Sequence, residues 1–287
     1  MERWKGLAVE SKGKPWWQYI NLLGLDAPLV AVLWLFLFAK TWRVNYHPWE
    51  AYVALGLIAW TVRIVVKLLE SVMADDKTTF QMVHRKGLRL IAVLAGITAL
   101  ILTVLNFPLS GYNYLFVGLI LVVSYIALTL FSSPEHGEIP YGKHAVGGIA
   151  FAFGTALMAH AYLPSLEIKE LLYSREFICF ALLCLIASAA VDLWSRTSRD
   201  GETESRVQDE IALSLPLTLL GAASLIFAVQ TESMIARPFF YGILTGAALL
   251  QVLNRMHHRF TFDNVKVLTS VCLLIPGIIF QAYEMSR

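Results

Sequence analysis

Residues 112–132 read YNYLFVGLILVVSYIALTLFS, a stretch without a single charged side chain. A helix needs about 20 mainly apolar residues to cross a hydrocarbon core of about 30 Å. The apolar residues here are continuous and do not alternate with polar ones, which is typical of a membrane helix and not of a barrel strand. The stretch therefore predicts a helix that spans a membrane.

The whole chain has the composition that such helices require. Of its 287 residues, 57% are hydrophobic and 15% are charged, against about 45–50% and about 25% in an ordinary soluble domain. A formal net charge of +2 without a dense run of Lys and Arg gives no indication of nucleic-acid binding. The composition excludes a soluble protein and predicts a single polytopic membrane domain over residues 1–287.

Apolar windows bounded by charged, proline or loop residues predict nine membrane-spanning helices and an all-α fold. Most Lys and Arg residues of the short connections fall on the side that holds the N-terminus, which predicts a cytoplasmic N-terminus and an external C-terminus. The longer polar connections on that side are expected at about 73–87, 133–145, 196–210 and 256–264. The predicted helices are 27–43, 50–72, 88–106, 112–132, 146–164, 176–195, 211–230, 238–255 and 265–283.

Charged residues inside the second predicted helix are the first indication of a site. Arg63, Lys67 and Glu70 are spaced so that they share one helical face. A cation deep in hydrocarbon costs about 2.5–3.5 kcal/mol, so this face predicts a polar cavity or acidic partners on neighbouring helices. For Lys67 and Glu70, an interfacial position in which the side chains snorkel to water is the alternative.

Acidic residues supply a second candidate cluster. Asp192 follows a nearly uninterrupted apolar stretch, so it is expected to point into the protein. Arg196 and Asp200 share its helical face if the helix continues, although Asp200 can equally be solvated at the helix end. Asp75 and Asp76 in the 73–87 connection are adjacent carboxylates of the kind that can hold Mg²⁺ together with a phosphate.

These features resemble the UbiA superfamily of intramembrane prenyltransferases. The layout of nine helices, with polar connections after the second and sixth, is similar over essentially the whole chain. Residues 60–70 look like the helix-two acidic motif of divergent members, and 189–194 look like the start of their second acidic motif. Residues 139–143 with 147–154 resemble the region that begins helix five, and 259–276 resemble the region that begins the last helix.

The resemblance implies a cavity in which carboxylates hold Mg²⁺ against an isoprenoid diphosphate. On this basis Asp192 is the predicted catalytic residue, and cationic side chains are expected to contact phosphate. The chain departs from the family in the first motif, where Arg63, Val66 and Lys67 accompany Glu70. One hypothesis is that Arg63 and Lys67 contact the anion directly. The predicted substrate-binding residues are Arg63, Lys67, Lys143 and Arg196, and the predicted metal ligands are Glu70, Asp75, Asp76, Asp192 and Asp200.

Three functions remain open from the sequence. The first is a prenyltransferase or related terpene cyclase that transfers or rearranges the alkyl group of a polyprenyl diphosphate. The second is a non-catalytic protein that binds an isoprenoid, quinone or other lipid, or a subunit of a membrane complex. The third is a transporter, because intramembrane charges can mark a substrate path. The expected location is the cytoplasmic membrane of a prokaryote, with membrane lipids and an isoprenoid as partners.

Overall fold

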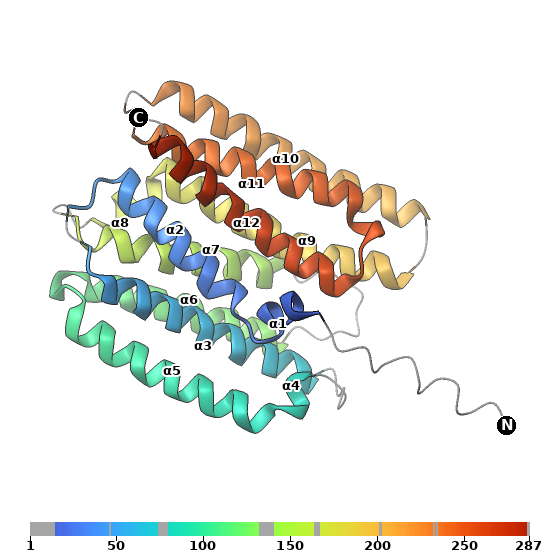
Figure 1. The fold of residues 1–287 in the computed structure, drawn as a ribbon, viewed down its shortest axis with the longest axis horizontal. Coiled ribbons are helices and arrows are strands. Elements are labelled where there is room, and N and C mark those ends of the chain that lie inside the picture. The colour runs from blue at the N-terminus through green and yellow to red at the C-terminus, as the bar shows by residue number, and fades with distance from the viewer. Residues whose placement is uncertain are drawn as a thin grey trace.

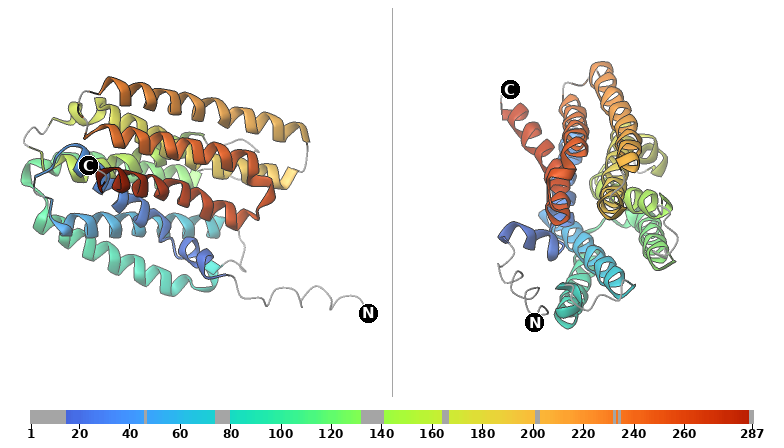
Figure 2. Two further views of the ribbon diagram at one scale, coloured as in Figure 1. Left: turned by 45° about the horizontal axis from the view of Figure 1, so that its top comes forward. Right: turned by 90° about the vertical axis from the view of Figure 1, so that its right-hand side faces the viewer.

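A computed structural model describes residues 15–45, 47–73, 80–131, 141–163, 167–200, 203–231, 233 and 235–285. All regular structure in these ranges is helical, and the longer helices run side by side along a common direction (Figures 1 and 2). The helices are α1 (Trp16–Leu22), α2 (Asp26–Thr41), α3 (Trp49–Met73), α4 (Phe80–Val83), α5 (Arg85–Asn106), η1 (Leu109–Gly111), α6 (Tyr112–Phe131), α7 (Tyr141–His160), α8 (Ile168–Tyr173), α9 (Arg175–Asp200), α10 (Thr203–Gln230), α11 (Arg237–Met256), η3 (His257–Arg259) and α12 (Phe262–Met285).

Each of the nine predicted ranges contains a long helix, but the polar connections are shorter than expected. Helix α7 begins at Tyr141, so Lys143 is helical and does not lie in the predicted 133–145 connection. Helix α9 continues to Asp200 and α10 begins at Thr203, which leaves little of the predicted 196–210 connection. Hydropathy marks where a helix leaves the hydrocarbon and not where its hydrogen bonds end. Apolar windows therefore predict loops at positions where polar turns still continue the helix.

Among the described residues, six helices are long and apolar enough to cross a membrane, namely α3, α5, α6, α9, α10 and α12. Helices α1 and α2 meet that test together, although they are bent by 80° at their junction, and they bring the total to seven if they form one span. The 20-residue helix α7 is not among the six, and it contains four glycines together with Lys143 and His144. The fold is therefore all-helical and compatible with an integral membrane protein.

The outer helices present apolar side chains to the surroundings. On α5, for example, Leu90 and Leu105 are 61% and 74% exposed, and on α10 Leu215 and Val229 are 64% and 72% exposed. Apolar patches of this extent are rare on soluble monomers. The surface of the bundle thus agrees with lipid as its solvent.

Helix α2 lies at the centre of the packed core. Trp34 is fully buried and stacks on Phe180 of α9 with a centroid separation of 4.4 Å. Its indole nitrogen donates a hydrogen bond to the Leu273 carbonyl of α12 at 2.9 Å. These contacts fix α2 between α9 and α12, and hence fix the position of Asp26 at its first turn.

A glycine allows α7 and α9 to approach closely. A Cβ atom added to Gly148 would lie 2.7 Å from the Leu185 Cα atom, a distance that real Cβ atoms essentially never show. The helices are therefore in contact at backbone level near this point. His144, one turn earlier on α7, is brought against α9 by the same approach.

Replacing Gly148 by alanine is expected to force α7 and α9 apart and to destabilise the protein by about 1–3 kcal/mol, the usual cost of overpacking. Gly154→Ala is the matched control on the same helix, because a Cβ there meets nothing within 4 Å. The midpoint of thermal unfolding in detergent micelles is measured for both variants. Equal midpoints for the two variants would contradict the close packing of α7 and α9.

The connection between α2 and α3 contains a histidine whose burial has a measurable consequence. His47 Nε2 lies 2.9 Å from the Met158 carbonyl, and the ring contacts Tyr52 and Tyr162. Desolvation lowers the pKa of His47 from its usual range, although the hydrogen bond to Met158 opposes that shift. The neutral imidazole is therefore the form that stabilises the fold.

A histidine with a lowered folded-state pKa contributes stability that is complete above the unfolded pKa of about 6.5 and is lost as the pH falls below it. We expect the thermal unfolding temperature of the wild type to decrease as the pH is lowered from about 8 to about 5. In His47→Gln this decrease is expected to be smaller. His258→Gln is the control, because His258 is exposed. An unchanged pH dependence in His47→Gln would show that another group is responsible.

Candidate functional site

A cavity of about 1620 Å³ lies inside the bundle. Its wall is formed by α2, α3, α5, α6, α7, α9 and α12, with α1 and α4 at one end. The charged side chains come from the C-terminal halves of α3 and α9 and from the N-terminal turns of α2, α7 and α12, which lie at the same end of these antiparallel helices. Apolar residues dominate the remaining wall, including Ile58, Ala99, Leu115, Leu119, Phe151 and Leu157.

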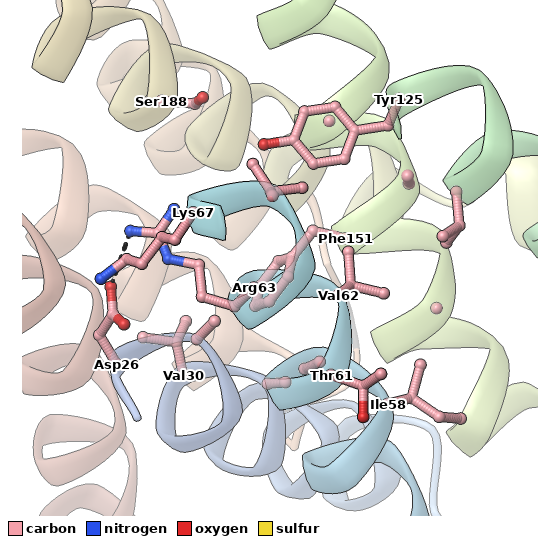
Figure 3. A pocket seen from close by; sticks show the side chains of 18 of the residues that line it. Asp26, Val30, Ile58, Thr61, Val62, Arg63, Lys67, Tyr125, Phe151 and Ser188 are labelled. Atoms are coloured by element: carbon pink, nitrogen blue, oxygen red, sulfur yellow. Dashed lines mark hydrogen bonds and ion pairs between the residues drawn. The ribbon is translucent and has the colours of Figure 1, made fainter. Parts of the chain in front are cut away.

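The first ion pair at the polar end joins Asp26 of α2 to Arg63 of α3. The Arg63 guanidinium donates to Asp26 Oδ2 at 3.0 Å, and the two side chains are 34% and 7% exposed, respectively (Figure 3). The Asn21 amide donates to the same oxygen at 3.1 Å. Lys67 lies beside the pair and donates to the Asn21 backbone carbonyl and to its Oδ1. Asp26 therefore supplies the acidic partner on a neighbouring helix that was predicted for Arg63.

A second ion pair closes part of the cavity wall between α3 and α7. Lys143 Nζ donates to Glu70 Oε1 at 2.6 Å. The Glu70 side chain is 47% exposed and the Lys143 side chain only 12%. Glu70 is thus engaged by a cation.

A histidine joins α7 to α9 on the same wall. His144 Nε2 lies 2.7 Å from Asp192 Oδ2, and His144 Nδ1 lies 2.8 Å from Ser188 Oγ. The histidine side chain is only 6% exposed, whereas that of Asp192 is 37% exposed. All three residues line the cavity.

The polar end carries cations without a carboxylate partner. Within the described part of the chain, neither Lys67 nor Lys266 forms an ion pair. Lys266 Nζ lies 4.2 Å from the centroid of the Phe262 ring. Lys67 and Lys266, from α3 and α12, therefore line the same end of the cavity as Arg63 and the carboxylates of Asp26, Glu70, Asp192 and Asp263.

The structure brings together five of the side chains that the sequence predicted for the site, from three different helices. Arg63, Lys67, Glu70, Lys143 and Asp192 all line this one cavity. Asp75 and Asp76 lie outside the described residues. Arg196 and Asp200 belong to α9, but their side chains are also outside the described part.

Several residues at the polar end were not predicted from the sequence. Asp26 stands at the boundary of an apolar window, where an acidic residue is read as the solvated end of a helix. His144 directly follows Lys143, which the sequence predicted for the site, and Ser188 is a single polar residue in an apolar segment. The one signal for Asp26 was the requirement that Arg63 find an acidic partner.

The described residues do not fit the coordination of Mg²⁺ that the UbiA resemblance implies. Asp26, Glu70 and Asp192 lie on three helices, and each is already bound to Arg63, Lys143 or His144. In the described ranges no three His, Cys, Asp or Glu side chains are grouped so that they could hold a metal ion. Asp26, Glu70 and Asp192 therefore act as partners in ion pairs and hydrogen bonds in this structure.

Comparisons with models of known protein families, with curated proteins and with solved structures find no match for this chain. The function is therefore argued from the cavity itself. Basic and acidic side chains lie together at one end of this cavity, and apolar side chains line most of the rest.

Proposed function

We propose that this chain is a UbiA-like membrane protein whose cavity binds a polyprenyl diphosphate. The observation that carries the proposal is the arrangement of Arg63, Lys67 and Lys266 at the polar end of a cavity whose remaining wall is mainly apolar. Guanidinium and ammonium groups pair with phosphate oxygens. The apolar wall offers the isoprenoid tail a surface that replaces its contacts with lipid.

The proposal includes nine membrane spans, with the N-terminus in the cytoplasm and the C-terminus outside. The excess of Lys and Arg in the short connections on the N-terminal side supports this orientation. In this orientation the polar end of the cavity faces the cytoplasm, because that is where α3 ends and α7 begins. A water-soluble diphosphate head is accessible from that side, and the tail extends toward the middle of the bilayer.

Alkyl transfer is the activity that fits such a cavity. Departure of diphosphate from an allylic carbon leaves a cation that must be shielded from water, and the apolar wall provides this shield. Fixed cations that stabilise the charge developing on the leaving group lower the barrier. A prenyltransferase or terpene cyclase is therefore our first candidate.

Binding without catalysis is the second candidate, and a specific observation favours it. Asp26, Glu70 and Asp192 on the cavity wall are each held by a cationic or imidazole partner. A cavity that has exchanged metal-binding carboxylates for ion pairs retains the capacity to bind an isoprenoid or another lipid. Fold alone does not decide between the two.

Binding of labelled geranylgeranyl diphosphate to the purified protein in nanodiscs tests the proposal. We expect saturable binding that is equally strong with Mg²⁺ and with a chelator, and weaker binding of geranylgeraniol, which lacks the anionic head. Release of diphosphate during incubation with candidate acceptors separates transfer from binding. Absence of saturable binding would overturn the proposal, and binding that requires Mg²⁺ would overturn its metal-independent head-group site.

A further inference from the structure

The first turn of α5 carries a cluster of cations on the outside of the bundle. Lys86 and Arg89 are exposed, and Arg85 is partly exposed. Residues three or four apart are neighbours on a helix surface, so Arg89 lies beside both of the others. None of the three lines the cavity. Arg85, Lys86 and Arg89 form what we call the basic patch, and it is separate from the cations of the cavity.

The basic patch forms no ion pair within the described part of the chain. The Nε atom of Arg85 is also buried there without a hydrogen-bond partner. Cations at the starts of other long helices are engaged by the protein itself. Lys143 of α7 pairs with a carboxylate, Arg175 of α9 lies over an aromatic ring, and Arg237 of α11 donates to a backbone carbonyl. The charge of the basic patch is therefore available to an external anion.

The position of the basic patch is unfavourable for α5 alone. The N-terminus is the positive end of the helix dipole, so it favours acidic side chains and disfavours cations. Helix α5 has no acidic residue in its first turn, and its N-cap residue makes no capping hydrogen bond through its side chain. Membrane topology favours Lys and Arg at one end of the bundle, but it does not require three of them at the start of one helix. An anion bound here offsets both the dipole and the repulsion among the cations.

An apolar stripe continues from the basic patch along the same face of α5. Val93, Ile97 and Val104 are 57%, 52% and 54% exposed, and none of them lines the cavity. Steps of four and seven residues place this stripe in line with Lys86 and Arg89. Val104 lies about 16 Å beyond Val93 along the helix axis, which is about the depth of one leaflet of a hydrocarbon core of about 30 Å. Helix α5 lies at the edge of the bundle and packs on α3, so the stripe is open to lipid (Figure 1).

We propose that this face of α5 binds one anionic phospholipid. The lipid phosphate lies at the basic patch, because guanidinium and ammonium groups pair with phosphate oxygens. One acyl chain lies along the apolar stripe. The ligand is a lipid and not a soluble anion, because the exposed apolar side chains stand directly in line with the cations. The site is outside the cavity, and it does not rest on the proposed function.

Native mass spectrometry of the full chain tests the proposal. The protein is released from micelles that hold equal amounts of phosphatidylglycerol and phosphatidylcholine with the same acyl chains, so that the two lipids differ in net charge. The wild type is expected to retain phosphatidylglycerol in preference to phosphatidylcholine. Lys86→Gln combined with Arg89→Gln is expected to lower this preference about 25-fold, or about fivefold for each cation, which corresponds to about 1 kcal/mol.

Arg255→Gln combined with Arg259→Gln is the matched control. It removes the same two charges from exposed residues at the end of the bundle where α5 begins. The control is expected to keep the preference of the wild type. Equal losses in the two double variants would overturn the proposal, because the attraction would then depend on net charge alone. A wild type that does not distinguish the two lipids would overturn it as well.

Two further measurements separate this site from the cavity and the lipid from its head group. Lys67→Met is expected to keep the preference, and a loss in Lys67→Met without a loss in Lys86→Gln with Arg89→Gln would place the anionic lipid in the cavity and overturn the proposal. Glycerophosphoglycerol, the head group without acyl chains, is expected not to displace the lipid at equal concentration, and displacement would exclude the apolar stripe from the site. Geranylgeranyl diphosphate binding is expected to be unchanged in Lys86→Gln with Arg89→Gln, so this proposal and the proposed function fail separately.

Discussion

Replacing Asp26 by alanine is expected to destabilise the protein by about 3 kcal/mol, at the lower end of the range for a broken buried ion pair. The substitution leaves the Arg63 guanidinium without its carboxylate partner and removes the acceptor of the Asn21 amide. The lower end applies because a third of the Arg63 side chain is exposed to the cavity. The measurement is the unfolding midpoint in detergent micelles, compared with that of the wild type.

A double substitution measures how much of the stability lost in the single variant comes from the interaction between Asp26 and Arg63. Asp26→Leu with Arg63→Met removes both charges, so it is expected to cost less than Asp26→Leu alone. Asp263→Ala is the control, because that carboxylate also lines the cavity but is not bonded to Arg63. If the single and double variants were equally unstable, Asp26 and Arg63 would not be coupled as the structure indicates.

Replacing Lys67 by methionine is expected to weaken binding of geranylgeranyl diphosphate by roughly 10- to 100-fold, which corresponds to the 1.5–3 kcal/mol of a hydrogen bond to a charged group. Methionine keeps the length and apolar character of the side chain and removes its charge. Lys67 has no carboxylate partner among the described residues, so its charge remains available to an anion. Equilibrium binding in nanodiscs is the measurement.

The matched control is Lys40→Met, in the last turn of α2 and outside the cavity. Its binding is expected to equal that of the wild type, and the geranylgeraniol affinity of Lys67→Met is expected to be unchanged because the alcohol has no anionic head. A Lys67→Met protein that bound the diphosphate as tightly as the wild type would exclude Lys67 from the head-group site.

The helical architecture can be predicted from the sequence because an apolar run long enough to cross a membrane predicts a helix. A window such as 112–132 can satisfy its backbone in lipid only as a helix, and α6 covers Tyr112–Phe131. Helix α1 was not predicted, because seven residues are too few to give an apolar window. The helix ends that lie beyond the apolar windows could not be predicted either. In water, polar residues can continue a helix as readily as they can end it.

Site residues could be predicted from the sequence only where a single charged residue interrupts an apolar segment. Arg63, Lys67 and Asp192 stand inside apolar segments, so the cost of burying charge marked them. Asp26 and His144 acquire meaning only from partners on other helices, 37 residues away in the case of Asp26 and 48 in the case of His144 with Asp192. Without knowledge of which helices are neighbours, no pattern in the sequence pairs these residues.

The central claim is that an isoprenoid diphosphate lies inside the bundle with its head at the cations. Photolabelling in nanodiscs with a geranylgeranyl diphosphate analogue, carrying its photoreactive group at the end of the tail, tests this directly. The account predicts that mass spectrometry finds the label on cavity residues such as Leu115, Leu119 and Leu157, and that unlabelled diphosphate competes it away. Label confined to exposed residues outside the cavity, such as Leu94 and Val104 of α5, would contradict it.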